Sequence, residues 1–357
     1  MLTRVLIVAN CAAICAAIVA AAWPATAAAA PNFADRPEVR EFAREVAERN
    51  GMKEERVLRI LRKATRLPAV LRAIAPSADP LRHSWQDYRA LFVNDARIDG
   101  GAEFWEHYAA TLARAREEFG IPEEILVAII GIETVYGRNI GRYRVLDALA
   151  TLAFDYPRRA DFFRAELEQF LLLTSELVTD PLAAKGSYAG AIGIPQFMPG
   201  SVRRFAIDYD GDGRADIAAS PEDAIGSVAN FLAHHGWVRN LAIAWRASVS
   251  PDGIEDLIAA GIKPQFAFAD LVTRGVTVEG VPPAAETALA LVDLPSRAVP
   301  VEFRLASGNF YTITRYNRSS FYAAAVTDLA MELRQRRDLA RNTPAEPLTR
   351  EFSAAPR

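Results

Sequence analysis

Residues 125–139 of the chain are ILVAIIGIETVYGRN, an almost wholly apolar stretch that contains one glutamate. Three of its apolar residues and this glutamate have the spacing i, i+3, i+4, i+7: Leu126, Ile129, Ile130 and Glu133. In an α-helix, residues with this spacing share one face. The stretch therefore predicts a helix that packs into a protein core, carries a carboxyl group on its buried face and ends near the glycine at position 137.

Two effects are expected to raise the pKa of Glu133. The C-terminal end of a helix dipole is negative and disfavours a carboxylate there, and removal from water disfavours the charged form as well. A carboxyl group that is protonated near neutral pH is suited to act as a general acid. The alternative is a structural ion pair with Arg138 or Arg142, which the spacing alone leaves open.

Composition excludes few classes of protein. The 357 residues are 51% hydrophobic and 24% charged, as in ordinary globular proteins, and the length allows two or three sub-domains. The formal net charge of -3 predicts no basic face, so nucleic acid is not expected as a partner.

The first thirty residues have the pattern of a secretory signal peptide. Arg4 precedes an apolar run, and Ala25-Thr26-Ala27 resembles a small-residue cleavage site. This predicts export to the periplasm. The alternative is an uncleaved membrane anchor, because the apolar run approaches the roughly 17–20 residues that span a bilayer.

Both cysteines, Cys11 and Cys15, lie within this segment, so cleavage would leave a mature chain without disulfides. Lipid modification is poorly supported, because Cys15 follows an isoleucine where lipoprotein signals have a small residue. Membrane association is expected only if a cysteine is lipidated or the signal stays uncleaved.

The remainder of the chain predicts a mainly α (α+β) fold. Residues 76–100 are expected to be largely loop, because they contain Pro76, Pro80 and an Asp-Gly-Gly turn. Period-two alternation at 299–305 indicates a strand, as do GVTVEG and TALALVDL just before it. Helical periodicity is found in the following ranges: 36–75, 102–118, 145–153, 159–179, 221–236 and 320–338.

The stretch DYDGDGRADI, residues 208–217, has the first half of an EF-hand calcium loop. Asp208, Asp210 and Asp212 occupy the first, third and fifth positions, and a glycine the sixth. Arg214 is seventh, where only the backbone carbonyl is required. The twelfth position is Ala219 instead of glutamate, so an Asx-rich turn without metal is the alternative.

Three longer segments together resemble one family closely. They are GIETVYGRNIGRYRVLDALATLAFDYPRRADFF (131–163), GSYAGAIGIPQFMPGSVRRFAIDYDGDGRADI (186–217) and FYTITRYNRSSFYAAAV (310–326). The chain is similar to the B-type lytic transglycosylases of bacterial murein, which have a lysozyme-like core. The resemblance covers about Trp85 to Leu333 and is weakest in the β-rich region.

The resemblance implies that Glu133 is the single catalytic acid/base. It implies cleavage of the β-1,4 bond between N-acetylmuramic acid and N-acetylglucosamine in peptidoglycan, with attack by the muramyl 6-hydroxyl and a 1,6-anhydro product. No catalytic cofactor is expected. The positions that match the substrate groove of the family are Tyr88, Arg158, Arg159, Ser187, Gln196, Tyr316, Asn317 and Tyr322. A hydrolytic muramidase and a non-catalytic glycan-binding protein remain as alternatives.

The resemblance also implies a further ligand for the calcium loop. In the family the bidentate acid comes from the start of the next helix, where this chain has Asp223. One structural Ca2+ with Asp208, Asp210, Asp212 and Asp223 as side-chain ligands is therefore expected. Two departures from the family pattern are Gly200, which replaces a common serine, and Phe231, which replaces a hydroxylated aromatic residue.

The expected organisation has six parts and a monomeric chain. They are a signal peptide (1–30), an N-terminal helical sub-domain (31–104), a lysozyme-like catalytic core with the EF-hand-like loop (105–240), a small β-rich insertion (241–306), a return to the core (307–340) and a flexible tail (341–357).

Overall fold

The computed structural model describes residues 32–75, 84–177, 179–250, 253–297 and 299–342. The predicted signal peptide, and all of the predicted tail beyond residue 342, lie outside these described residues. In the part of the chain that is described, no helix combines the length and the apolar character needed to cross a membrane.

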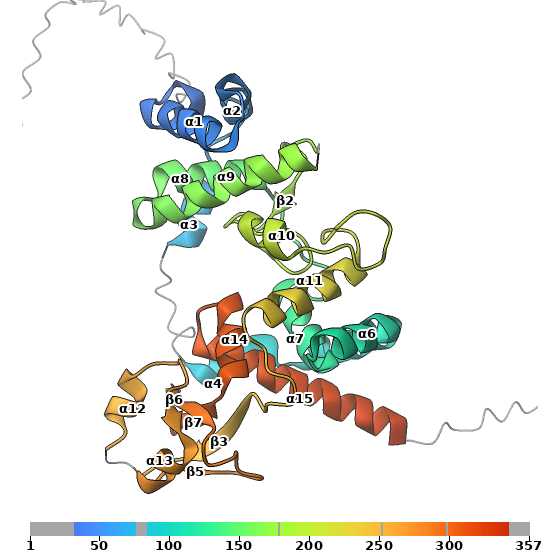
Figure 1. The fold of residues 1–357 in the computed structure, drawn as a ribbon, viewed down its shortest axis with the longest axis vertical. Helices are drawn as coiled ribbons and strands as arrows, with labels where there is room; N and C mark the ends of the chain where they lie inside the picture. Colours follow the sequence, from blue (N-terminus) through green and yellow to red (C-terminus); the bar gives the residue numbers. More distant parts are fainter. Residues whose placement is uncertain (1–31, 76–83, 178, 251–252, 298, 343–357) are drawn as a thin grey trace, which may run out of the picture. The chain divides into compact units, whose positions relative to one another are not determined.

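The described chain is mainly helical, as predicted (Figure 1). The helices are η1 (Phe33–Asp35), α1 (Pro37–Asn50), α2 (Glu54–Leu61), α3 (Pro68–Ile74), α4 (Trp85–Phe92), α5 (Asp95–His107), α6 (Ala109–Phe119), α7 (Glu123–Thr134), α8 (Val145–Asp155), η3 (Pro157–Arg159), α9 (Ala160–Glu176), α10 (Pro199–Phe205), α11 (Pro221–His234), α12 (Glu255–Ala259), α13 (Phe268–Thr273), α14 (Gly308–Tyr316) and α15 (Ser320–Asn342).

The strands form two antiparallel sheets. Strands β1 (Tyr143–Arg144) and β2 (Lys185–Gly186) pair with each other. The second sheet has the order β4-β6-β7-β3-β5 and lies wholly within the predicted insertion at 241–306 (Figure 1). Its strands are β3 (Ala244–Ser248), β4 (Phe266–Ala267), β5 (Thr277–Val278), β6 (Ala288–Leu294) and β7 (Glu302–Ala306). All three predicted strands are thus present.

One hydrophobic cluster unites the first helices with two that come much later in the chain. It contains buried residues of α1 and α2, such as Val39 and Leu61, together with Leu149 of α8 and Phe170 of α9. Helix α1 ends at Gly51, which adopts the left-handed conformation at φ 63° that glycine favours at a helix C-terminus. This cluster joins residues from both sides of the predicted boundary at residue 104.

The largest cluster surrounds α7. The three apolar residues of its predicted stripe, Leu126, Ile129 and Ile130, are fully buried. Helices α5, α6, α11 and α15 pack against α7. The helix is buried on nearly every side because most of its other residues are apolar too. Its predicted role at the centre of a core is confirmed.

The prediction of loop at 76–100 is wrong from residue 85 onward, where α4 and the first part of α5 are found, and residues 76–83 lie outside the described residues. Gly100 and Gly101 lie inside α5 because Tyr136 packs directly on them. A Cβ atom at Gly101 would overlap the Tyr136 hydroxyl and Leu333. This close packing offsets the roughly 1 kcal/mol by which a helical glycine is less favourable than alanine.

Candidate active site

Glu133 lies in the last turn of α7, and the chain after it has an uncommon backbone. Val135 and Tyr136 have φ angles of 51° and 61°, in the left-handed region that side chains other than glycine rarely adopt. The conformation is most unfavourable for a β-branched residue, and such strain clusters at functional sites. The structure therefore marks the end of α7 as a candidate functional site.

Thr134 anchors this helix end to the loop at 193–197. Its hydroxyl donates a hydrogen bond of 2.8 Å to the carbonyl oxygen of Ile194 and accepts one of 3.0 Å from the backbone N–H of Gly137. The side chain is fully buried. The position of Glu133 is thus determined by a second segment of the chain as well as by its own helix.

The carboxyl group of Glu133 is partly buried and accepts a hydrogen bond of 2.6 Å from the hydroxyl of Tyr322. Burial raises the pKa of Glu133 to about 7, and the hydrogen bond from Tyr322 opposes this rise. The predicted rise in pKa is confirmed. The alternative ion pair is not found in the described chain, where Arg138 pairs with Glu103 at 3.5 Å instead.

Tyr322 is predicted above to contact substrate, but in the structure it is buried and hydrogen-bonded to Glu133. Its side chain is only 2% exposed, so its ring is not available as a platform for a sugar. The ring is nearly parallel to that of Tyr316, with centroids 6.3 Å apart. Burial raises the pKa of both tyrosines, which keeps them neutral hydrogen-bond donors.

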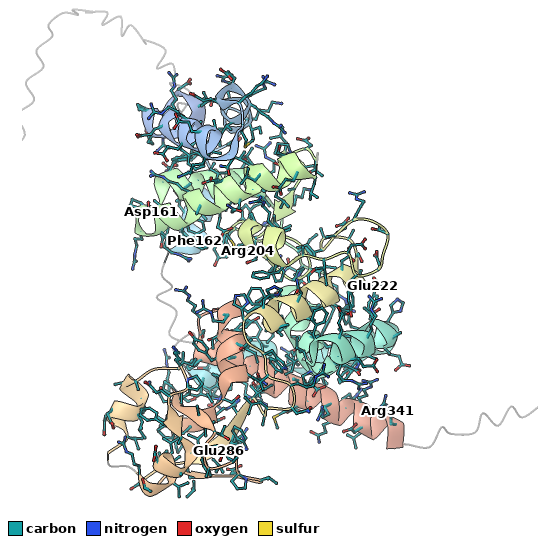
Figure 2. All side chains as sticks on the ribbon, viewed as in Figure 1. Asp161, Phe162, Arg204, Glu222, Glu286 and Arg341 are labelled. Atoms are coloured by element: carbon teal, nitrogen blue, oxygen red, sulfur yellow. The ribbon has the colours of Figure 1, made fainter. Side chains whose placement is uncertain are left out.

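Tyr316 lies at the wall of a cleft of about 650 Å³, which we call the Tyr316 cleft. Four of the predicted substrate residues line it: Arg159, Gln196, Tyr316 and Asn317. The sequence analysis missed other lining residues, including Phe162, Arg204, Phe231 and His235. Phe162 and Arg204 are labelled in Figure 2. Of these four, the sequence analysis noted only Phe231, as a departure from the family pattern.

Charge and aromatic rings meet in this cleft. The guanidinium carbon of Arg159 lies 4.3 Å from the ring centroid of Phe162, a cation–π contact. Phe231, noted above for lacking a hydroxyl, packs edge-on against Tyr316 at 4.9 Å and stacks on His235 at 4.0 Å. The cleft therefore offers both flat apolar surfaces and cationic groups to a ligand.

Gln196 is held in one orientation. Its φ of 52° is left-handed, and its side-chain amide donates hydrogen bonds to the carbonyl oxygens of Ile140 (3.1 Å) and Gly193 (2.8 Å).

Gly200 lies close by in sequence, and its backbone N–H donates to the carboxylate of Glu166 at 2.8 Å. A serine side chain at this position would have to fit against Glu166.

Besides Tyr322, three more of the eight predicted substrate residues do not line the described Tyr316 cleft. The hydroxyl of Ser187 accepts hydrogen bonds from Ala189 N and Ala191 N. The ring of Tyr88 packs on Phe92 and Phe321, with centroids 5.0 and 5.5 Å away. Arg158 is exposed in η3.

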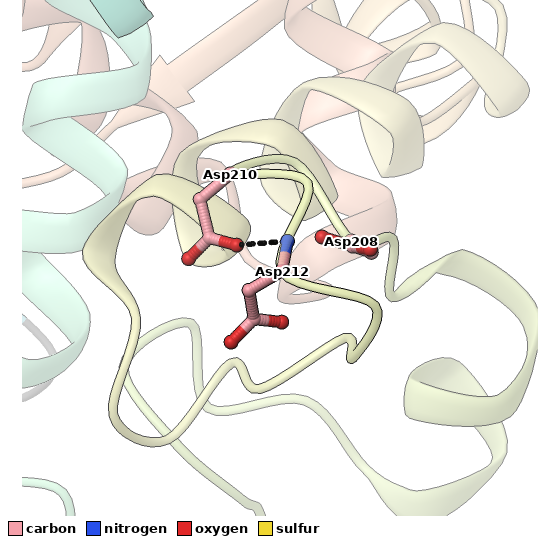
Figure 3. A group of neighbouring side chains, drawn as sticks. All are labelled: Asp208, Asp210 and Asp212. Carbon is pink, nitrogen blue, oxygen red and sulfur yellow. Dashed lines mark hydrogen bonds between the residues drawn. The ribbon is translucent and has the colours of Figure 1, made fainter.

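The aspartate loop brings three of its predicted ligands together (Figure 3). Ligand atoms of Asp208, Asp210 and Asp212 all lie within 4.8 Å of one another, and all three side chains are exposed. The loop is folded by Asx-type hydrogen bonds, such as that from Asp212 N to the Asp210 carboxylate at 3.0 Å. Such a set of oxygens suits a hard cation such as calcium.

Asp223 is not part of this group, contrary to the prediction. It is fully buried, and its carboxylate accepts hydrogen bonds from the backbone N–H groups of Tyr209 (2.6 Å), Asp210 (3.1 Å) and Asp216 (2.7 Å). Buried N–H groups need such acceptors. Asp223 therefore supports the backbone of the loop. The carbonyl of Arg214, the other predicted ligand, accepts from Asp216 N at 3.2 Å.

The mainly helical fold places Glu133, whose pKa is raised to about 7, in hydrogen-bond contact with Tyr322, and the ring of Tyr322 stacks on that of Tyr316 at the wall of the cleft. This fold and site are those of a lysozyme-like enzyme. A family model described as "Transglycosylase SLT domain" matches residues 34–331, and the chain belongs to this family. The chain is 39% identical over 307 residues to the membrane-bound lytic murein transglycosylase B of Escherichia coli (strain K12), with 84% of this chain and 83% of that protein covered.

Solved structures show the same fold. The catenated lytic transglycosylase SltB1 from Pseudomonas aeruginosa is 43% identical, with a TM-score of 0.80 over 85% of this chain and 99% of that one. Escherichia coli Slt35 in complex with calcium is 38% identical, with a TM-score of 0.77 and coverage of 86% and 96%. Pseudomonas aeruginosa SltB3 in complex with NAG-anhNAM-pentapeptide is 29% identical, with a TM-score of 0.71 and coverage of 83% and 79%.

Proposed function

We propose that this chain is a lytic murein transglycosylase. It cleaves the β-1,4 bond between N-acetylmuramic acid and N-acetylglucosamine and leaves a 1,6-anhydromuramyl end. The observation that carries the proposal is the pKa of about 7 at Glu133, produced by burial against the hydrogen bond from Tyr322. A group with this pKa exchanges protons in both directions near neutral pH, which a single acid/base must do.

The reaction needs one carboxyl group and no added water. Protonated Glu133 gives its proton to the glycosidic oxygen as the bond from that oxygen to the anomeric carbon breaks. The N-acetyl oxygen of the substrate stabilises the cationic carbon, as in other substrate-assisted glycosidases. The 6-hydroxyl then attacks this carbon, and the Glu133 carboxylate takes its proton. Glu133 ends protonated, ready for the next cycle.

Tyr322 has a positioning role in this scheme. Its hydroxyl is the hydrogen-bond donor to Glu133, so it orients the carboxyl group and favours the anion that must form after the first proton transfer. Glu133 is linked to the Tyr316 cleft through Tyr322, which is hydrogen-bonded to Glu133 and whose ring stacks on that of Tyr316. We assign sugar binding to this cleft, with Gln196, Tyr316 and Asn317 as lining groups and Arg159 as a partner for carboxylates.

The test is digestion of purified murein followed by mass spectrometry of the products. The proposal expects muropeptides lighter by one water than hydrolysis products, and their loss in Glu133→Gln by a factor of about 10²–10⁴ or more. Products at the hydrated mass would instead make the chain a muramidase. Unchanged turnover by Glu133→Gln would contradict the mechanism, and binding without turnover by the wild type would indicate a non-catalytic glycan-binding protein.

A single structural Ca2+ in the aspartate loop is the second part of the proposal. The Asp208, Asp210 and Asp212 carboxylates would hold it, with the Arg214 carbonyl as a further oxygen. The ion would neutralise the clustered negative charge. The calcium complex of Slt35 supports this assignment. Asp223 acts indirectly, by holding the backbone that presents the three aspartates.

We further infer that residues 1–30 export the chain to the periplasm, where it acts on peptidoglycan as a monomer. Mass spectrometry of the mature N-terminus tests this: cleavage after the alanine-rich segment supports it. An intact segment or a lipidated cysteine would make the enzyme membrane-associated.

A further inference from the structure

A second cleft, of about 500 Å³, lies between α14, α15 and the sheet of the insertion. We call it the α14 cleft. Leu291 and Val292 of β6 contribute apolar surface, as do Ile258 and Ile262 from the segment around α12. Polar groups come from α14 and from the first residues of α15. None of its lining residues is among those predicted from the sequence.

Two arginines of the α14 cleft are available to bind a ligand. Arg315 and Arg318 are exposed, and neither makes a hydrogen bond or an ion pair with another described residue. The guanidinium carbon of Arg315 lies 5.8 Å from the ring centroid of Tyr311, which also lines the cleft. Guanidinium groups recognise carboxylates through paired, charge-assisted hydrogen bonds. The pair is therefore suited to bind a ligand with free carboxylates.

The cleft also contains a negative group. Asp293 of β6 lines it together with the arginines, and its side chain is partly exposed. Separate positive and negative groups above an apolar floor match a ligand that carries carboxylates, an amino group and small apolar side chains. A short peptide with free acidic and amino groups has this combination.

The two clefts share a wall. Arg315 and Arg318 line the Tyr316 cleft as well as the α14 cleft. The two clefts therefore adjoin at these arginines, and a substituent on a sugar in the first cleft would meet them on the way to the second. An extended peptide reaches about 3.3–3.6 Å per residue, so a stem of four residues spans roughly 13–14 Å.

We propose that the α14 cleft binds the stem peptide carried by the muramyl residue, with carboxylates on Arg315 and Arg318 and the amino group on Asp293. The inference rests on the proposed function, because it takes the glycan to lie in the Tyr316 cleft. It assigns the β-rich insertion a role in substrate selection: the enzyme would prefer strands that still carry peptides over strands from which an amidase has removed them.

The test compares kcat/KM on peptide-bearing murein with kcat/KM on glycan strands stripped by an amidase. We expect the wild type to prefer the peptide-bearing substrate, and Arg318→Gln and Asp293→Asn to reduce this preference by about tenfold, mainly through KM, as expected for loss of a charge-assisted hydrogen bond. Lys263→Gln is the matched control, because it removes one positive charge next to Ile262 without touching the cleft. An unchanged preference in Arg318→Gln, or an equal loss in Lys263→Gln, would overturn the inference.

A binding measurement separates this inference from the proposed function. If the wild type cleaves neither substrate, the proposed function fails, and the site is then tested by calorimetric titration with a free stem tetrapeptide that has free carboxylates and an amino group. Binding that is about tenfold weaker in Arg318→Gln supports the site. Equal affinity in the two proteins, or no binding to the wild type, contradicts it.

Discussion

The hydroxyl of Tyr322 donates a 2.6 Å hydrogen bond to Oε1 of Glu133 across a sequence separation of 189 residues. Burial of Glu133 and this hydrogen bond have opposite effects on the pKa of its carboxyl group. Burial of Glu133 raises its pKa, and the hydrogen bond lowers it, which leaves the pKa at about 7. The relation between α7 and α15 thus determines when the proposed acid is charged.

Replacement of Tyr322 by phenylalanine is expected to raise the pKa of Glu133 further, because only the opposing effect of burial remains. The alkaline limb of the pH–kcat profile should move up by about 1–2 pH units, since a hydrogen bond to a charged group contributes about 1.5–3 kcal/mol. Tyr156→Phe, in the other hydrophobic cluster, is the control and should keep the wild-type profile. A Tyr322→Phe profile that coincides with the wild type would contradict the assigned role.

The pKa of Glu133 also predicts how stability depends on pH. The ordinary value is 4.5 and the folded value about 7, so between these pH values the folded state binds more protons than the unfolded state. The free energy of unfolding should therefore fall as pH rises through this window, by about 3 kcal/mol in all. The contribution is fully present below pH 4.5 and lost above pH 7.

Glu133→Gln isolates this contribution, because glutamine cannot ionise. Urea unfolding should show the variant to be more stable than the wild type by about 3 kcal/mol at pH 8, with the difference disappearing near pH 4.5. Two stability curves that run parallel over this range would show that Glu133 is not buried in an unfavourable, chargeable form.

Glu123, at the other end of α7, should contribute strongly to stability. It is 5% exposed, accepts hydrogen bonds from Trp105 Nε1 at 2.6 Å and from Arg337 at 2.8 Å, and forms an ion pair with Arg116 at 2.9 Å. Burial alone raises the pKa of Glu123, but the hydrogen bonds from Arg337 and Trp105 outweigh it and hold this pKa below its ordinary value.

Glu123→Ala should therefore lower the free energy of unfolding by about 3 kcal/mol, measured with urea at pH 7. Glu117→Ala is the control. Its side chain is 77% exposed and lies 3.8 Å from Arg116, so its loss should matter by less than about 0.5 kcal/mol. Similar effects of the two variants would count against a buried network.

Calcium should stabilise the fold through the aspartate loop. At a free concentration one hundred times its Kd, the ion would add about 2.7 kcal/mol, seen as a higher Tm than in EDTA. Asp212→Asn should reduce this shift, because it removes one of the three clustered carboxylates. Asp161→Asn, in α9, is the control and should leave the shift intact. An identical Tm of the wild type in calcium and in EDTA would argue against the site.

Some of the candidate site followed directly from local pattern. The spacing of Glu133 on an apolar stripe predicted both its burial and the direction of its pKa shift, because a helix projects such residues on one side regardless of distant contacts. The same holds for the alternating strands of the insertion and for the three aspartates, which lie close together because two-residue steps in a tight loop keep them near one another.

Other features depend on contacts between distant segments. Gly100 and Gly101 predicted a turn from the sequence. In the structure they lie within a helix, and the ring of Tyr136 packs in the space that side chains at these two positions would occupy. Asp223 indicated a metal ligand, but three backbone N–H groups occupy its carboxylate. Neither outcome can be read from neighbouring residues.

The sequence by itself therefore determined the class of fold, the family and the choice of Glu133 as the proposed acid, because periodicity and motif are properties of short segments. Only the tertiary structure decided that Tyr322 donates a hydrogen bond to Glu133, which lowers the pKa of that carboxyl group, and that Arg315 and Arg318 line both clefts. The reason is physical: desolvation and hydrogen bonding depend on which atoms lie within a few ångströms, and folding brings those atoms from remote parts of the chain.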